Sequence, residues 1–185
     1  MLSALVEAAQ RGDHAAFEQL MAGTLDRSYA TAAWILRDHH AAEEAVQEAM
    51  IRAWRDLPAL RDVNRFEPWL RRLVVHSCYD EARRLRRQRT AQLTLSEPMT
   101  RVDDPAETVA SRDAVERALS KLNPMQRAAV VLRHAVGLSV PDVAEAMGVP
   151  LGTAKSRLHH AERALRAAMS APRSSATEPT ESGRS

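Results

Sequence analysis

The helical spacing of apolar residues constrains the fold of this 185-residue chain more than any other feature. In residues 42–57 these residues recur at i, i+1, i+4 and i+5, which places them on one face of a helix that ends at Pro58. The same period runs through residues 3–21, 25–37 and 67–89. No stretch shows the two-residue alternation of a β-strand. The sequence therefore predicts an all-α fold.

Helical periodicity stops between residues 90 and 108, where TAQLTLSEPMTRVDDPAET contains two prolines, hydroxyl side chains and acids. It resumes at residue 109 and ends near residue 170. The polar tail, residues 171–185, lacks core residues, and we expect it to be disordered. The sequence thus predicts two small helical domains, residues 1–89 and 109–170, joined by a flexible linker.

Basic residues are concentrated in two parts of the chain, although the net charge is only +2. Residues 61–89 hold nine arginines against four acids, and residues 121–171 hold seven basic residues against three acids. Residues 1–57 and the linker region are acidic. This distribution is expected if two surfaces meet phosphate groups and the others meet a different partner.

Other composition features favour a cytoplasmic, non-enzymatic protein. Cys78 is the only cysteine, so an internal disulfide is excluded, and we expect a buried, inert thiol. No apolar run reaches the roughly 18 residues of a membrane span, and MLSALVEAAQRGD does not resemble a signal peptide. The sequence has no glycine-rich phosphate loop, nucleophile elbow or His/Cys metal spacing, so no enzyme activity, cofactor or metal is predicted.

Residues 139–165 have the pattern of a helix-turn-helix. Ser139 can cap a short helix, Gly148 suits the turn, and a longer helix follows from Leu151. The second helix of such a motif enters the major groove of DNA. Its apolar stripe starts at Ala154, and the other sides carry the candidates for DNA contact: Thr153, Lys155, Ser156, Arg157, His159, His160 and Arg163. The alternative is a helical hairpin whose polar face meets only solvent.

Three segments, AEEAVQEAMIRAW, RFEPWLRRL and LNPMQRAAVVLRHAVGLSVPDVAEAMGVPLGTAKSRLHHAERALR, resemble bacterial sigma factors of the extracytoplasmic-function (ECF) group. The resemblance covers most of residues 5–168. It implies that residues 1–89 correspond to sigma region 2 and residues 109–170 to region 4, without a region 3 domain. It also implies an alternative sigma factor that directs promoter-specific initiation by RNA polymerase.

For the helix in residues 42–57, the resemblance implies docking on the clamp coiled coil of the largest polymerase subunit. The polymerase β flap is a further expected contact of the chain. The side of the helix away from its apolar stripe carries Glu43, Glu44, Gln47, Glu48, Ile51, Arg52 and Arg55. An exposed Ile51 among charged residues suits the centre of a protein interface with a polar rim. The alternative is an acidic face that meets only solvent.

For residues 58–89, the resemblance implies capture and melting of the minus-10 promoter element. The loop before the long helix and one face of that helix would hold a flipped base and steer the single strand. The residues expected there are Arg61, Asn64, Arg65, Trp69, Arg72, His76, Asp80, Arg83, Arg84 and Arg87. Related proteins often carry asparagine where His76 and Asp80 stand, so the base preference stays open. A structural hydrogen bond between these two residues is the alternative.

For residues 109–170, the resemblance implies recognition of the minus-35 element by the helix that begins at Leu151. Related helices commonly read SRLHRARRALR, whereas this chain has His160 and Glu162 in place of two arginines. Two weak promoter contacts on one tethered chain can still give adequate affinity. The resemblance also implies an anti-sigma protein as partner. The main alternative function is a helix-turn-helix regulator that acts without polymerase.

Overall fold

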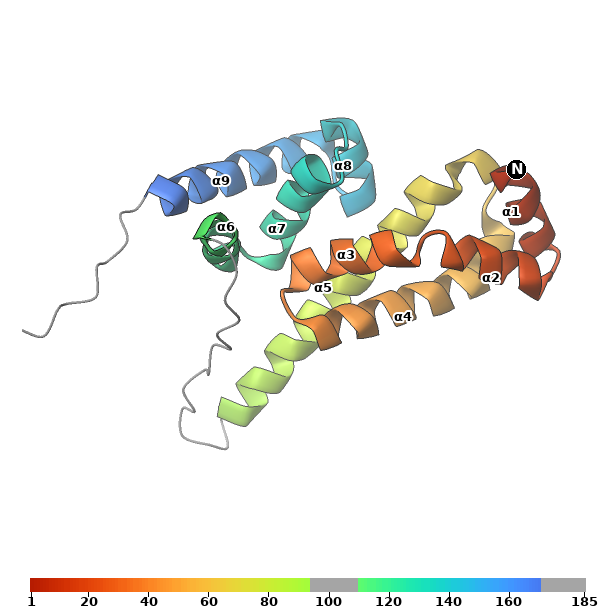
Figure 1. Ribbon diagram of the computed structural model, residues 1–185, viewed down its shortest axis with the longest axis horizontal. Coiled ribbons are helices and arrows are strands. Elements are labelled where there is room, and N and C mark those ends of the chain that lie inside the picture. The colour runs from red at the N-terminus through yellow and green to blue at the C-terminus, as the bar shows by residue number, and fades with distance from the viewer. Residues whose placement is uncertain (94–109, 171–185) are drawn as a thin grey trace, which may run out of the picture.

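The computed structural model describes residues 1–93 and 110–170, and every regular element within these two ranges is a helix (Figure 1). The predicted all-α fold is therefore confirmed. The polar tail lies outside the described residues, as does most of the predicted linker. Residues 90–93, which were assigned to the linker, instead form the end of a long helix.

Five α-helices make up residues 1–93. α1 (Leu2–Gln10) and α2 (His14–Ala22) pair at one end, α3 (Leu25–Leu36) packs on α4 (His39–Asp56), and α5 (Phe66–Leu93) packs on both α3 and α4 (Figure 1). Two short 3-10 turns, η1 (Leu57–Ala59) and η2 (Val63–Arg65), connect α4 to α5. The side chains of Asp13 and Asp38 accept hydrogen bonds from backbone N–H groups in the first turns of α2 and α4.

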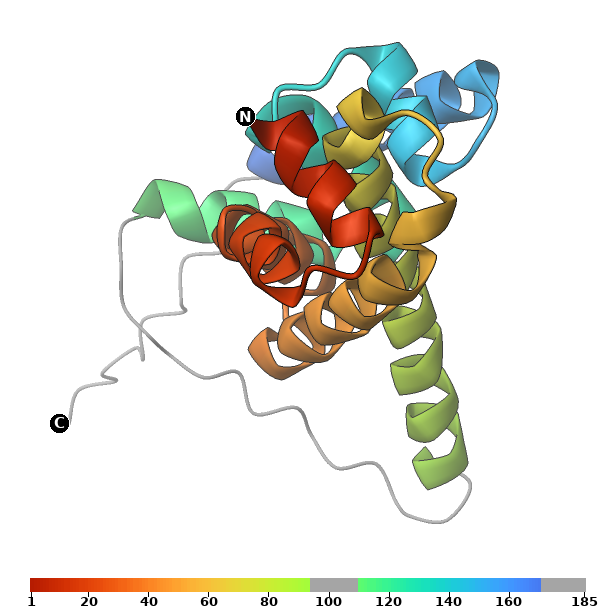
Figure 2. The ribbon, with the colours of Figure 1, turned by 90° about the vertical axis from the view of Figure 1, so that its right-hand side faces the viewer.

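Small side chains on α4 explain the close packing of α3, α4 and α5. Ala42, Ala45 and Ala49 of α4 are fully or almost fully buried, as the apolar period of this segment predicts. Because alanine has a short side chain, neighbouring helices can approach closely. The C-terminal part of α5, which carries the arginine-rich sequence, projects beyond the other helices (Figure 2).

The C-terminal half contains α6 (Ala110–Ser120), α7 (Pro124–Val130), α8 (Val140–Met147) and α9 (Leu151–Ser170). Asn123 and Gln126 form a capping box at the start of α7, where Pro124 occupies the first turn. A π-helical turn, η3 (Val131–Ala135), follows α7 directly. The sequence predicts a plain helix up to Gly137, and the π turn is a difference that apolar periodicity cannot reveal.

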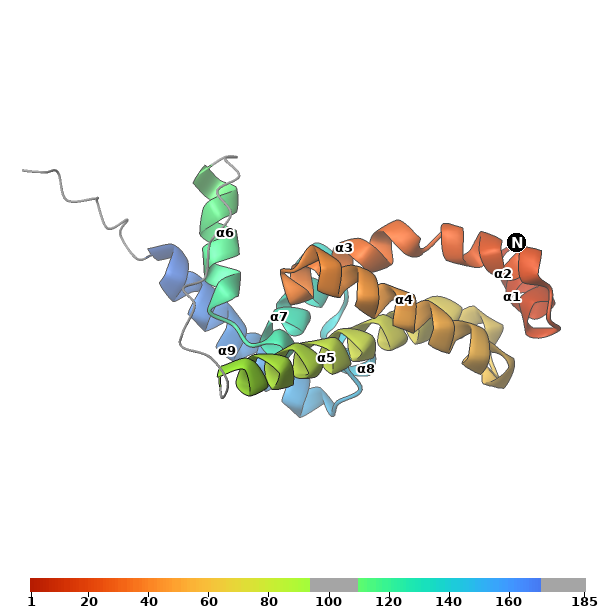
Figure 3. The same cartoon turned by 90° about the horizontal axis from the view of Figure 1, so that it is seen from below.

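One apolar core is shared by the two halves of the chain. α8 packs against α5, and α7 packs against α3 and α5 (Figure 3). Val75 and Tyr79 of α5 belong to the same buried cluster as Met147 of α8. The sequence predicts two tethered units but contains no signal for this contact, because it joins residues that are distant along the chain.

Candidate nucleic-acid interface

α9 has one buried stripe and one exposed face, as its sequence predicts. Ala154, Leu158 and Ala161 are buried. Of the predicted DNA contacts, Lys155, Ser156, His159, His160 and Arg163 are exposed, while Thr153 and Arg157 are partly buried. No heavy atom lies within 4 Å of the position that a Cβ of Gly152 would occupy. The first turn of the exposed face is therefore open to a ligand.

Gly148 forms the turn between α8 and α9. Its φ of +64° lies in the left-handed region, which glycine adopts without strain. The N–H groups of Gly148 and Val149 donate to carbonyl groups in the last turn of α8, each at 3.0 Å. At the other end of α8, the Ser139 hydroxyl accepts a hydrogen bond from the backbone N–H of Asp142. These features form the predicted helix-turn-helix.

Glu162 has a partner within the C-terminal half. Its Oε1 lies 3.0 Å from Nε2 of His134 in η3. The contact therefore ties α9 to the π turn. This contact gives a structural reason why position 162 carries a carboxylate, whereas the sigma factors that the sequence resembles commonly have arginine there.

The predicted minus-10 residues follow the loop before α5 and then α5 itself. Arg61, Asn64 and Arg65 are exposed in the loop, and the Asn64 side chain accepts a hydrogen bond from Ser3 Oγ at 3.3 Å. Trp69 is partly buried beside Phe66. Farther along α5, exposed side chains include Arg72, Asp80, Arg83, Arg84 and Arg87. The predicted set thus forms an extended surface rather than a single pocket.

Several of these side chains are already engaged by protein groups. Asp80 accepts a hydrogen bond from Arg52 at 2.9 Å, and Arg84 makes two hydrogen bonds to Glu81, at 2.7 and 2.8 Å. The guanidinium group of Arg65 pairs with the carboxylate of Glu145 on α8. A hydrogen bond between His76 and Asp80, the structural alternative to DNA contact by these two residues, is not among the contacts of the described residues.

His76 faces the helix-turn-helix. Together the two halves line a small cavity of about 210 Å³, whose walls are His76, Tyr79, Asp80, Arg83, Met125, Met147, Val149 and Arg157. Arg157 belongs to the predicted minus-35 set, and His76 to the predicted minus-10 set. The structure therefore brings one member of each set to the same cavity.

Burial and charge keep the His76 ring neutral. Burial is the largest cause that lowers its pKa, and the positive charge of Arg72 lowers it further. The Met147 backbone and Asp80 oppose this shift. Nε2 is buried and has no hydrogen-bond partner among the described residues. Two residues later, burial raises the pKa of the Cys78 thiol to about 12, which agrees with the inert thiol expected from the sequence.

The residues predicted to dock on polymerase lie on the outer face of α4, and most of them are exposed. Glu43, Glu44, Gln47, Glu48 and Arg55 are exposed, and Arg52 is partly buried. Ile51 is 56% exposed, with charged side chains before and after it on the same face. Trp54 differs from its predicted core position. It is 37% exposed and packs its ring against His14 and Phe17 at the surface.

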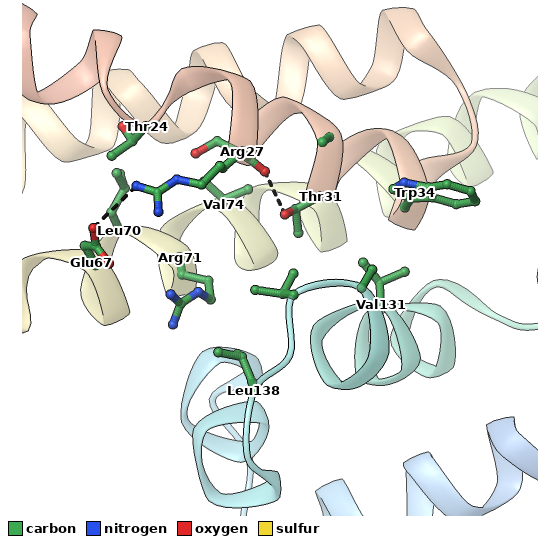
Figure 4. Close-up of a pocket in the computed structure, with 14 residues that line it drawn as sticks. Thr24, Arg27, Thr31, Trp34, Glu67, Leu70, Arg71, Val74, Val131 and Leu138 are labelled. Atoms are coloured by element: carbon green, nitrogen blue, oxygen red, sulfur yellow. Dashed lines mark hydrogen bonds and ion pairs between the residues drawn. The ribbon is translucent and has the colours of Figure 1, made fainter.

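A larger cavity of about 410 Å³ lies between the two halves (Figure 4). Trp34 of α3, Leu70 of α5 and Val131 of η3 contribute to its walls, and the Arg27–Glu67 ion pair, at 3.4 Å, lies at the same cavity. None of the predicted DNA-binding or docking residues lines it. The sequence does not predict this cavity, because the segments that form its walls are distant from one another along the chain.

Within residues 1–93 and 110–170, every helix is too short or too polar to span a membrane. No group of three or more His, Cys, Asp or Glu side chains in these ranges is arranged to hold a metal ion.

Comparisons with known proteins match both halves of the chain to families. Residues 20–88 match Sigma-70 region 2, and residues 112–165 match Sigma-70, region 4. The ECF RNA polymerase sigma factor SigM of Mycobacterium tuberculosis is 37% identical over 161 residues, covering 87% of this chain and 81% of SigM. The ECF RNA polymerase sigma factor SigW of Bacillus subtilis is 27% identical over 179 residues, covering 90% of this chain and 95% of SigW.

A solved structure agrees with these matches. The sigma factor RpoE, crystallised with the anti-sigma factor NepR from Bartonella quintana, gives a TM-score of 0.66 at 26% identity, covering 83% of this chain and 96% of RpoE. The order of the two matched regions, the helix-turn-helix and the overall helical arrangement lead to the same conclusion. The chain belongs to the ECF group of RNA polymerase sigma factors.

Proposed function

We propose that this chain binds core RNA polymerase in the cytoplasm and directs promoter-specific initiation of transcription. In this proposal the outer face of α4 docks on the clamp coiled coil, and the C-terminal half meets the β flap. α9 reads the minus-35 element, while the loop at 61–65 and α5 capture and melt the minus-10 element. No enzyme activity of the chain itself is part of the proposal.

The observation that carries this proposal is the combination of two exposed faces in one chain. α9 exposes Ser156, His159 and His160 on the side away from its buried stripe and Lys155 on the flank, which suits entry into a major groove. α4 exposes Ile51 among charged side chains, which suits a protein interface. A regulator that acts alone on its operator has no need for the second face.

Within this division of roles, the arginines of α5 supply charge more than sequence specificity. Arg83, Arg84 and Arg87 are exposed on α5, where they can approach the phosphate backbone. His159 and His160 can donate to base edges even when neutral. We also propose an anti-sigma protein as a partner, supported by the RpoE neighbour, which was crystallised with one.

A run-off transcription assay tests the function. Purified chain is added to core polymerase on a library of promoter fragments, and start sites are mapped. We expect discrete starts that require both components. Transcription that does not change when the chain is added, together with tight duplex binding by the chain alone, would support the regulator that acts without polymerase.

A further inference from the structure

The N-terminal helix α1 packs on the loop that carries the first residues of the proposed minus-10 face. This loop, residues 57–65, contains η1 and η2 and leads into α5. α1 contacts both of these turns (Figure 2). Val6 of α1 is fully buried in one apolar cluster with Leu57, at the start of the loop, and Phe66, directly after it. Apolar burial therefore keeps α1 beside the loop.

Gln10, the last residue of α1, binds the backbone of the loop directly. Its Nε2 donates to the carbonyl group of Leu57 at 3.1 Å and to that of Leu60 at 2.7 Å. The side-chain amide has two N–H donors, so one group can satisfy both carbonyl groups at once. The amide oxygen cannot replace Nε2, because it would lie against two carbonyl oxygens. Both hydrogen bonds are partly buried, where water competes less well for the same groups.

A second side chain of α1 reaches the other end of the loop. The backbone N–H of Asn64 donates to Asp62 Oδ1 at 3.0 Å, and the Asn64 side chain accepts from Ser3 Oγ at 3.3 Å. The contact with Ser3 is exposed and longer than those of Gln10. Gln10 is therefore the main polar contact from α1 to the loop.

The loop held in this way carries side chains that are assigned to DNA. Arg61 follows Leu60 directly, and Asn64 lies three residues farther on. Both side chains are exposed, so packing of these side chains cannot fix the loop. Precise contact with a strand requires a backbone held in place by surrounding residues, because a small misplacement is costly.

We propose that Gln10 is a positioning residue for capture of the minus-10 strand. By holding the carbonyl groups of Leu57 and Leu60, it keeps the 57–65 loop in the conformation that presents Arg61 and Asn64 to the DNA. The role in capture rests on the proposed function, whereas the hold on the loop does not. Gln10 itself needs no contact with DNA or polymerase to act in this way.

Gln10→Glu tests the two hydrogen bonds with little change in side-chain size. An ionised carboxylate cannot donate, so the variant loses both contacts and repels the carbonyl oxygens. Gln10→Lys is the rescue variant, because its ammonium group carries three N–H donors. Gln19→Glu and Gln19→Lys in α2 are the matched controls. The Gln19 side chain is exposed and has no hydrogen bond in the described part of the chain.

Hydrogen–deuterium exchange of the full chain measures the order of the loop without polymerase or DNA. The N–H groups of Leu60 and Arg65 donate within the loop, so their exchange reports its opening. We expect Gln10→Glu to raise their exchange rates roughly three- to tenfold, and Gln10→Lys and the Gln19 variants to resemble the wild type. Unchanged loop exchange in Gln10→Glu would overturn the proposal. An equal rise throughout α3 and α4 would also overturn it, because the whole fold would then have loosened.

Run-off transcription with core polymerase tests the role in capture. The readout is the ratio of transcripts from two promoter fragments that differ only in the minus-10 element. We expect Gln10→Glu to lower this ratio roughly three- to tenfold, and Gln10→Lys to restore it. A merely structural role would reduce both transcripts equally, and an unchanged ratio would overturn the proposal. If the wild type gives no polymerase-dependent start, the proposed function and the role in capture both fail, and exchange alone decides whether Gln10 holds the loop.

Discussion

Arg52 of α4 donates from Nη1 to Asp80 of α5 at 2.9 Å, while its Nε donates to Glu48 of α4 at 2.7 Å. The hydrogen bond to Glu48 is the largest cause that raises the pKa of Arg52, and Asp80 adds to it. Glu48 and Arg52 belong to the proposed docking face, whereas Asp80 belongs to the proposed minus-10 face. One guanidinium group therefore links two surfaces to which the sequence assigned separate roles.

The Arg52–Asp80 link predicts a measurable coupling in stability. Arg52 and Asp80 side chains are 26% and 48% exposed, so we expect a coupling free energy of only about 0.5 kcal/mol. Urea unfolding of Arg52→Ala, Asp80→Ala and the double variant measures it. Arg83→Ala is the control, because Arg83 lies farther from Asp80, at 3.6 Å, and is more exposed. Strict additivity of the two single effects would contradict the link.

Gly148→Ala should destabilise the protein. The left-handed φ costs a residue with a Cβ about 1–2 kcal/mol, and the contact with His76 adds to this cost. We therefore expect the substitution to cost less in a His76→Ala background. Urea unfolding of the two single variants and the double variant checks this. Gly152→Ala, in open space within α9, is the control and should be neutral or stabilising. An equal cost of Gly148→Ala in both backgrounds would exclude the steric contact.

Local patterns predicted the helices and the helix-turn-helix because the relevant forces act over a few residues. The cap at Ser139 and the stripe from Ala154 are confirmed by burial and hydrogen bonding. Contacts between distant segments could not be predicted in this way. Arg65 and Glu145 are 80 positions apart, and neither has a sequence signature of its partner. The roles of the individual DNA-binding and docking residues remain predictions.

The packing of α8 against α5 should weaken as pH falls. Burial lowers the pKa of His76 from 6.5, so the folded chain takes up a proton on this ring less readily than the unfolded chain does. The contribution of His76 to the free energy of unfolding is therefore unaffected above pH 6.5, becomes destabilising as pH falls below it, and levels off below the lowered pKa.

The groups that face His76 come from all the surrounding elements: Arg72 and Asp80 on α5, Arg52 on α4, the Met147 backbone on α8, and Tyr79, Arg83 and Arg157 around the shared cavity. Urea unfolding of the wild type and of His76→Gln, measured from pH 8 to 5.5, checks the prediction. His76→Gln should remove most of the pH dependence. The same pH dependence in the wild type and in His76→Gln would assign the dependence to another titratable group.

Ile51→Glu should weaken binding to core polymerase while leaving the fold intact. The side chain is 56% exposed in the free chain, so its replacement loses little packing, but a carboxylate at the centre of an apolar contact is costly to desolvate. We expect at least a tenfold loss of affinity, since about 1.4 kcal/mol corresponds to tenfold. Leu25→Glu changes another exposed aliphatic side chain, on α3, and should bind like the wild type. Equal losses in the two variants would move the docking surface away from α4.

Substitutions on α9 should change promoter choice without changing polymerase binding. Lys155 is exposed on the flank of the apolar stripe and His160 on the side away from Ala154, so their loss leaves the packing of the helix-turn-helix intact. Removing a good base contact costs about 1–3 kcal/mol of discrimination. We therefore expect Lys155→Ala and His160→Ala to lower run-off transcription from minus-35-dependent promoters roughly tenfold or more. Lys121→Ala, an exposed lysine before α7, is the control. Because neither residue belongs to the proposed docking face of α4, co-purification with polymerase should be unchanged. A parallel loss of core binding in both α9 variants would refute this division of roles.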